Sequence, residues 1–329
     1  MELTSEIRKA TDPIYQKISK ILPEIEWAVH APYIHKINKL KKEKNAIILA
    51  HNYQTPEIYH GIADVAADSL ALAIEASKTN ADLIIMCGVH FMAETAKLMN
   101  PQKRVFLPDM NAGCSLSSSI TGKDVRLLKK KYPGVPVVSY VNTSADVKAE
   151  TDICCTSANA VKIVNSLGVK KVIFLPDDYL AKYVASQTDV KIISWKGTCI
   201  VHEQFNEKEI NEIRKNNPGI KIIAHPECPP DVIKASDFAG STTGMIKYVE
   251  DNQPKKVMMV TECSMSDNVQ IENPNVKFIK PCNLCPHMKK ITLPKILDCL
   301  ENETNEIIMS NETIAKARIS VERMTAVGR

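Results

Sequence analysis

Short apolar runs recur along the chain, and polar residues capable of chemistry follow each run directly. Three of the runs share one form, and they read NAIILAHNYQ (45–54), GVPVVSYVNTS (134–144) and GIKIIAHPECP (219–229). Unbroken apolar runs of this length are typical of strands that are buried on both faces of a parallel sheet. The pattern therefore predicts three equivalent strands, whose carboxyl ends carry His51, Tyr140 and His225.

Two further sets of runs follow in the same order. One set reads ADLIIMCG, KKVIFLPD and KKVMMVTE, and begins at Ala81, Lys170 and Lys255. The other reads VFLPDMNAGC, VKIISWKGTC and VKFIKPCNLC, and ends at Cys114, Cys199 and Cys285. Because these cysteines are 85 and 86 residues apart, the sequence indicates one α/β unit that occurs three times.

A stretch with helical character separates the first two strands of each unit. These stretches read DSLALAIEASK, TSANAVKIVNS and STTGMIKYVED, and each begins with residue types that cap helices. Alternating strands and helices predict the α/β class, with three similar αβα domains and parallel sheets around a pseudo-threefold axis. We expect a helical N-terminal extension, three α/β repeats, and a helical C-terminal segment that packs on the first repeat, at 1–44, 45–120, 121–205, 206–290 and 291–329.

Composition and charge narrow the class of protein. The chain has 329 residues, a formal charge of +4 and ten cysteines, and its lysines are scattered rather than clustered. Scattered charge argues against a nucleic-acid partner, and no apolar run reaches the roughly 18–20 residues of a membrane span. Since the N-terminal residues also lack an apolar signal core, we expect a cytoplasmic protein with reduced thiols. Cys154, Cys155 and Cys299 are then expected on helices, as buried structural thiols.

The strand ends predict a metal site. Ligands of parallel α/β sheets bind beyond the carboxyl ends of the strands, where Cys114, Cys199 and Cys285 would converge. Structural zinc and a fully ligated iron–sulfur cluster each take four protein ligands, so three thiolates leave one metal position open. A [4Fe–4S] cluster with an open iron can polarise a substrate oxygen as a Lewis acid. Cys282 with Cys285 offers a rival interpretation as a zinc half-site or redox pair, and Cys282 is the alternative third ligand.

Helix starts and polar strand ends predict the rest of the site. Helix N-termini favour phosphate and carboxylate groups, and the expected starts contain Ser69, Ser157, Ser241 and Thr242. Each of these hydroxyls can also serve only as a helix cap. Acid–base candidates lie at the same edges, and they are Glu227, His225, His51, Tyr53, Tyr140 and His202. For an isolated histidine such as His202, a purely structural role is the competing interpretation.

Ten motifs appear in order along most of the chain. They are HNYQ (51–54), CGVHFMAETAK (87–97), GCSL (113–116), YVNTSA (140–145), TSANA (156–160), FLPD (174–177), KGTCIVHE (196–203), HPEC (225–228), GSTTGM (240–245) and CPHMK (285–289). On these motifs the chain resembles the quinolinate synthases from about residue 45 to residue 287.

The resemblance implies three αβα domains around a central [4Fe–4S] cluster held by Cys114, Cys199 and Cys285. It implies condensation of iminoaspartate with dihydroxyacetone phosphate to quinolinate, with loss of phosphate and water, in de novo NAD biosynthesis. The supplier of iminoaspartate would be an L-aspartate oxidase or dehydrogenase. The catalytic residues that carry over are Glu227, Tyr53, Tyr140 and His202. The substrate-binding residues that carry over are His51, Ser69, Tyr140, Asn142, Ser157, His225, Glu227, Ser241 and Thr242.

Two other functions stay open at the level of sequence. One is another iron–sulfur hydro-lyase that acts on a small carboxylic acid. The other is a non-enzymatic iron–sulfur sensor, which would need a basic or apolar docking face that the sequence does not display.

Overall fold

The computed structural model describes residues 1–280 and 282–328. Within them the chain forms two compact units. The first contains the segments 1–112, 263–274 and 284–307, and the second contains 113–262, 275–283 and the C-terminal segment from 308.

The first unit is built on one four-stranded parallel sheet with strand order β2-β1-β3-β4. Its strands are β1 (Ala46–His51), β2 (Val65–Ala67), β3 (Leu83–Cys87) and β4 (Arg104–Phe106). Every residue of β3 is buried, as its unbroken apolar run predicts. Ile48 pairs with Ile85 and Leu49 pairs with Val65, so the central strand β1 has a parallel neighbour on each side.

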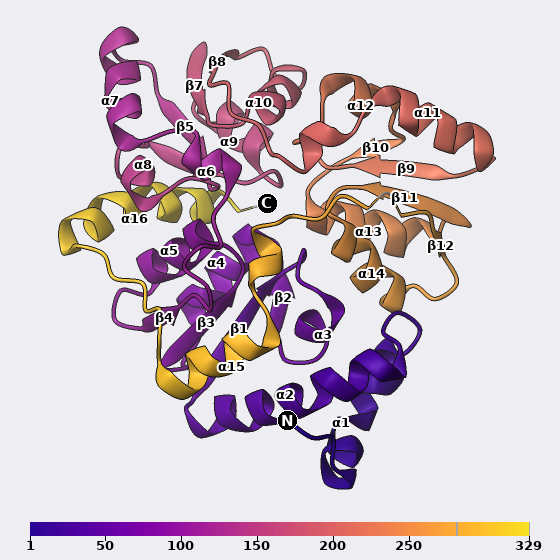
Figure 1. Ribbon diagram of the computed structural model, residues 1–329. Helices are drawn as coiled ribbons and strands as arrows, with labels where there is room; N and C mark the ends of the chain where they lie inside the picture. Colours follow the sequence, from indigo (N-terminus) through magenta and orange to yellow (C-terminus); the bar gives the residue numbers. More distant parts are fainter. Residues whose placement is uncertain (281, 329) are drawn as a thin grey trace. The chain divides into compact units, whose positions relative to one another are not determined.

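Helices cover both faces of this sheet (Figure 1). They are α1 (Ser5–Ile18), α2 (Glu24–Glu43), α3 (Pro56–Tyr59), α4 (Ser69–Lys78), α5 (His90–Met99), α14 (Cys263–Glu272) and α15 (Leu293–Asn302), with the 3₁₀ turn η2 (Met288–Lys290). Helices α4 and α5 pack against each other and against the strands, and α2 and α15 form the second layer against β1 and β3. The predicted helical N-terminal extension is therefore present as α1 and α2.

The second unit contains two more four-stranded parallel sheets. Their strand orders are β6-β5-β7-β8 and β10-β9-β11-β12. The strands are β5 (Val137–Tyr140), β6 (Ile153–Cys155), β7 (Lys171–Leu175), β8 (Lys191–Ser194), β9 (Lys221–Ala224), β10 (Phe238–Ala239), β11 (Lys256–Val260) and β12 (Lys277–Phe278). Each sheet encloses an apolar core, for example around Ile173 and Leu175 in one and around Ile222 and Met258 in the other.

The helices of the second unit begin with recognisable caps. They are α6 (Ser115–Ser118), α7 (Gly122–Lys131), α8 (Ala145–Ala149), α9 (Ala160–Ser166), α10 (Asp178–Ala185), α11 (Glu207–Asn216), α12 (Pro230–Ala235), α13 (Thr242–Asn252) and α16 (Asn311–Val327), with the 3₁₀ turn η1 (His202–Gln204). Thr121 and Asp124 form a reciprocal capping box at α7, which stabilises this lysine-rich helix although it buries little apolar surface. Helices α10 and α12, which belong to the two different repeats, contact each other.

The three sheets share one strand order, with the first strand in second place and the fourth strand at an edge. This shared topology confirms the predicted α/β class and the internal repeat. The arrangement of the three repeats around an axis, and the five proposed domain boundaries, stay predictions.

Several local predictions were wrong. Each repeat has an additional short strand that the apolar pattern did not reveal, namely β2, β6 and β10. Cys154 and Cys155 are buried as expected, but they lie on strand β6 rather than on a helix. The C-terminal segment divides, because α15 packs in the first unit whereas α16 packs on α8 and β6 of the second. Only part of it therefore covers the first repeat.

One of the three helix starts differs from the prediction. Helix α4 begins at Ser69 as predicted, and its N-cap is Asp68, whose side chain accepts a hydrogen bond from the backbone N–H of Ala71. Helix α9 begins only at Ala160, so Ser157 lies in the loop before it. Ser241 caps α13 as predicted, because its hydroxyl accepts from the N–H of Gly244.

No helix among the described residues is long and apolar enough to cross a membrane.

Candidate functional site

Glu227 joins the carboxyl ends of two sheets in the second unit. It follows strand β9, and Tyr140 ends strand β5 of the other sheet. The Tyr140 hydroxyl donates to Oε1 of Glu227 over 2.6 Å, and the Asn142 amide donates to the same oxygen over 3.4 Å. Glu227 is 4% exposed. A buried carboxylate of this kind needs donors, and here they come from the neighbouring repeat.

His202 occupies the other side of the same carboxyl group. Its Nδ1 lies 2.8 Å from Oε2 of Glu227 and 3.1 Å from Sγ of Cys199. Its Nε2 lies 2.9 Å from the Thr261 hydroxyl, which follows strand β11. With contacts at both ring nitrogens, the imidazole is fixed in orientation between a carboxylate and a thiol.

A second imidazole extends the cluster. The rings of His225 and His202 stack with their centroids 4.9 Å apart. His225 Nε2 lies 3.1 Å from the Ser157 hydroxyl, and its Nδ1 accepts from the backbone N–H of Glu227 at 3.4 Å. The cluster thus connects Cys199 at one end with Ser157 at the other.

The electrostatics of the cluster favour an ionised Glu227. Burial acts to raise the pKa of Glu227, but the charges of His202 and His225 and the hydrogen bonds from His202 and Tyr140 outweigh it, so the pKa lies below its ordinary value. For Cys199, burial and the nearby Glu227 and Cys114 raise the pKa of the thiol well above its ordinary value. The carboxyl group can therefore accept a proton, while the thiol needs a metal cation nearby to become a thiolate.

Asp177 is a buried carboxyl group close enough to interact with Glu227. It follows strand β7 and is 0% exposed. Its Oδ1 accepts from the backbone N–H groups of Tyr179 and Leu180 at the start of α10, whereas Oδ2 has no hydrogen-bond partner among the described residues. Burial, followed by the charge of Glu227, raises the pKa of Asp177 well above its ordinary value. Burial and the neighbouring Glu227 therefore both favour the protonated form of Asp177.

Cys114 and Cys199 are neighbours in the second unit. The Ser115 hydroxyl donates to the Thr198 carbonyl at 3.0 Å and accepts from the Ile200 N–H at 3.2 Å, which fixes the two cysteine-bearing segments together. Cys114 also contributes to the raised pKa of Cys199. Soft sulfur donors suit iron–sulfur clusters, and imidazole or carboxylate ligands suit harder metals. Ligand atoms of Cys199, His202 and Glu227 lie within 4.8 Å of one another, so these residues fit a metal-containing group.

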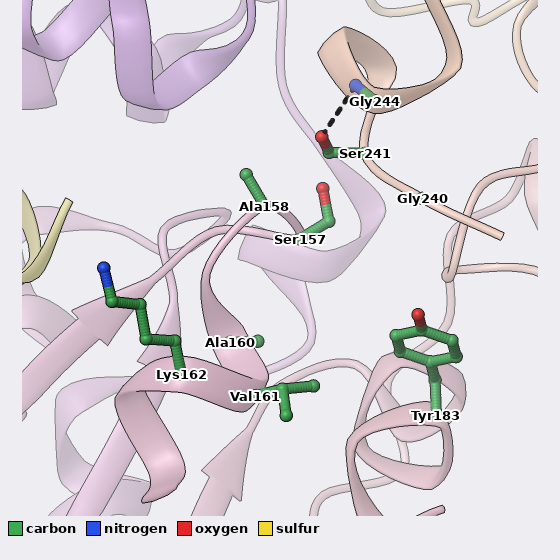
Figure 2. A pocket seen from close by; sticks show the side chains of 9 residues that line it. All are labelled: Ser157, Ala158, Ala160, Val161, Lys162, Tyr183, Gly240, Ser241 and Gly244. Carbon is green, nitrogen blue, oxygen red and sulfur yellow. Dashed lines mark hydrogen bonds between the residues drawn. The ribbon is translucent and has the colours of Figure 1, made fainter. Parts of the chain in front are cut away.

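A pocket of about 470 Å³ lies beside the cluster (Figure 2). It is lined by Ser157, Ala158, Ala160, Val161, Lys162, Tyr183, Gly240, Ser241 and Gly244. Figure 2 shows the Ser157 and Ser241 hydroxyls approaching from opposite sides, one from the loop before α9 and the other from the start of α13. Two of the hydroxyls predicted to hold anions therefore line one pocket, and Thr242 is buried next to Ser241 at the helix start.

The remaining predicted site residues belong to the first unit. His51 ends strand β1 and is 5% exposed, and its ring lies 4.7 Å from that of Tyr53 in an edge-to-face arrangement. Ser69 is the first residue of α4, and Cys285 lies partly buried ahead of η2. Cys282, the alternative ligand, is exposed.

Sequence reasoning missed three contributors to the site: Thr261, Asp177 and Ser115. Thr261 directly follows strand β11 and Asp177 lies two residues after strand β7, so the strand-end rule that selected Glu227 could have selected them. Ser115 follows a predicted ligand, but no sequence pattern indicates its bridging hydrogen bonds.

The chain is similar to known proteins of one family over most of its length. A family model described as quinolinate synthetase A protein matches residues 35–326. A quinolinate synthase of Sinorhizobium fredii (strain NBRC 101917 / NGR234) is 59% identical over 324 residues, covering 98% of this chain and 90% of the relative. Quinolinate synthase 2 of Mesorhizobium japonicum is 57% identical over 323 residues, covering 98% of this chain and all of the relative. A quinolinate synthase of Caulobacter vibrioides (strain NA1000 / CB15N) is 55% identical over 325 residues, covering 98% and 89%.

Proposed function

This chain belongs to the quinolinate synthetase A family, and from that premise we propose how its residues carry out the reaction. It is an enzyme that forms quinolinate in NAD biosynthesis.

The substrates are iminoaspartate and dihydroxyacetone phosphate, which condense with loss of phosphate and water. Both are anionic, and the pocket of Figure 2 offers hydroxyl groups and the N-terminus of α13 for such groups. Ser157, Ser241 and Thr242 bind a phosphate or carboxylate there, and Asn142 and His225 contact the same substrate. In the first unit, His51 and Ser69 bind a further part of it.

Cys114, Cys199 and Cys285 would hold a [4Fe–4S] cluster whose fourth iron has no protein ligand. When bound, that group supplies a Lewis acid that stabilises negative charge as an oxygen leaving group departs. The adjacency of Cys114 and Cys199 supports this assignment. Cys282 is the alternative to Cys285.

Glu227 acts as the base of the reaction. Its carboxylate accepts a proton during isomerisation and dehydration, because its neighbours hold it in the ionised form. The Tyr140 hydroxyl, already hydrogen-bonded to Oε1, returns a proton or holds the developing oxyanion. His202 fixes the direction of Oε2, and Tyr53 provides a second phenol in the first unit.

The observation that carries the proposal is the contact series from Tyr140 through Glu227 and His202 to Cys199. It places a base and a phenol next to a metal-ligating thiol. The direct test is to supply iminoaspartate and dihydroxyacetone phosphate to anaerobically purified protein and to measure quinolinate by mass spectrometry. Quinolinate formation supports the proposal. Iron-replete protein that makes none, but dehydrates another small carboxylic acid, would indicate a different hydro-lyase.

An L-aspartate oxidase or dehydrogenase would supply the iminoaspartate. Because cysteine thiolates that hold a cluster must stay free of disulfides, we place the reaction in the cytoplasm, where thiols are kept reduced.

A further inference from the structure

Lys148 is a charged residue that is completely buried in the second unit. It lies in helix α8 with 0% of its surface exposed. Its ammonium group donates to the backbone carbonyl of Val141 at 2.8 Å and to the carbonyl of Thr143. A buried ammonium is costly unless its donors are satisfied, so this arrangement strongly favours the backbone conformation that presents both carbonyls.

The two carbonyls flank Asn142, in the loop that follows strand β5. The same loop is tightened by a bond from the Thr143 N–H to the Val141 carbonyl and by another from the Thr143 hydroxyl to the Tyr140 carbonyl. The side chains that this short segment presents, Tyr140 and Asn142, are the two that donate to Oε1 of Glu227. The Lys148 ammonium therefore lies behind the loop that orients the Glu227 carboxylate.

The position of Lys148 is fixed in turn by the C-terminal helix. The Ser320 hydroxyl of α16 donates to the Lys148 backbone carbonyl at 3.0 Å, and the Cys154 thiol of β6 approaches Ser320 at 3.3 Å. Helix α16 packs along α8 over this region. The position of Lys148 thus depends on the packing of α16, a helix that is distant from Glu227 in the sequence.

The first unit contains a similar arrangement at the equivalent loop. After strand β1, the Lys289 ammonium donates to the Tyr53 carbonyl at 2.8 Å and to the Ser264 hydroxyl at 2.7 Å. Tyr53 occupies the place in its repeat that Asn142 occupies in the second repeat. A lysine that donates to a backbone carbonyl of a loop carrying predicted site residues therefore occurs in both units.

We propose that Lys148 is a positioning residue for the reaction: its ammonium group sets the loop 140–143 so that Tyr140 and Asn142 face Glu227. This inference rests on the proposed role of Glu227. Lys148 touches neither substrate nor metal and acts only through the loop.

The test compares Lys148→Met, which keeps the length of the side chain but removes its donors, with Lys129→Met as a matched control. Lys129 lies on α7 of the same unit, where its ammonium is 3.7 Å from Asp152 at the surface. All proteins are purified anaerobically and compared for iron content, circular dichroism and steady-state kinetics. We expect Lys148→Met to lower kcat about 10- to 100-fold, with KM changed less than about threefold and iron retained. Lys129→Met should match the wild type.

A double-mutant cycle separates positioning from a general loss of stability. If Lys148 acts through Tyr140 and Asn142, Lys148→Met should lower kcat much less in a Tyr140→Phe/Asn142→Ala background than in a background that keeps both side chains. Equal losses in both backgrounds would overturn the proposal, and so would a wild-type kcat in folded Lys148→Met.

Lys148→Gln covers the case in which the methionine variant does not fold. Its shorter amide cannot reach both carbonyls, so kcat should again fall, and an unchanged kcat would contradict the proposal. The wild-type assay distinguishes the two levels of inference. Wild-type protein without quinolinate formation would refute the proposed function, whereas active wild type with unaffected Lys148 variants would refute only the role of Lys148.

Discussion

The Tyr140 hydroxyl donates to Oε1 of Glu227 over 2.6 Å, and this bond connects the ends of parallel strands from two different repeats. Neither repeat contains both groups of the proposed acid–base site. The second sheet of the chain supplies the phenol, and the third supplies the carboxylate. Triplication of one α/β unit therefore has a chemical consequence, because equivalent strand ends carry different functional groups that meet.

Replacing Glu227 with glutamine should abolish turnover without removing the metal. The amide is nearly isosteric, so Tyr140 and His202 keep a partner, but it cannot accept a proton. We expect kcat to fall roughly 10²- to 10⁴-fold, which is the usual contribution of general acid–base catalysis. Iron and sulfide content should stay at the wild-type level, and turnover close to normal would remove Glu227 from the catalytic set.

Tyr140→Phe should lower kcat, but by less than Glu227→Gln does. It removes the hydrogen bond to a buried carboxylate, and bonds to charged groups contribute about 1.5–3 kcal/mol. We expect kcat to fall about 10- to 100-fold. Since Tyr140 also helps to hold the pKa of Glu227 low, the acid limb of the rate profile should move to higher pH. Rates measured from pH 3 to 9 follow this limb, and a limb that stays in place or moves to lower pH would argue against this role.

Single cysteine variants test the ligand set. Cys114→Ser, Cys199→Ser and Cys285→Ser should each lose the visible absorbance and most of the iron of anaerobic protein, because a cluster held by three thiolates does not tolerate the loss of one. Cys154→Ser is the control, because that thiol is buried on β6 and contacts Ser320. Loss of iron in Cys282→Ser together with retention of iron in Cys285→Ser would identify Cys282, and not Cys285, as the third ligand.

The lowered pKa of His60 predicts that the protein loses stability in mild acid. Burial, followed by the charge of Lys17, lowers the pKa of His60 from 6.5 to about 4. Between pH 6.5 and 4, His60 is therefore mostly protonated in the unfolded chain and mostly neutral in the folded one. The free energy of unfolding then decreases as the pH falls towards 4. At pH 5 the loss is on the order of 2 kcal/mol. Urea unfolding at pH 7.5 and 5.0 measures it, and His60→Asn should reduce the difference; an equal difference in the variant would contradict this origin.

The sequence predicted the repeat because strand ends and cysteines keep a common phase, and that phase depends only on local apolar runs. It did not predict the short strands β2, β6 and β10, since two or three residues carry too little periodicity. Strand β6 shows why: Cys154 and Cys155 are small apolar residues that fit either structure, and pairing with β5 decides in favour of the strand.

The remaining residues whose roles the sequence did not predict depend on contacts that form only in the folded chain. Glu227 and Tyr140 were recognised because each follows an apolar run. The role of Lys148 was not, since it depends on the fold of one loop and on the packing of α16 against α8. Likewise, Ser157 was expected at a helix start. The Thr156 N–H instead donates to the side chain of Asn159 in a turn, and α9 begins only at Ala160.

Iron and acid-labile sulfide analysis of anaerobically purified protein tests the central claim most directly. The account predicts about four irons and four sulfides per chain, the content of one [4Fe–4S] cluster. Protein that is folded and active in quinolinate formation but contains zinc, or no sulfide, would contradict it.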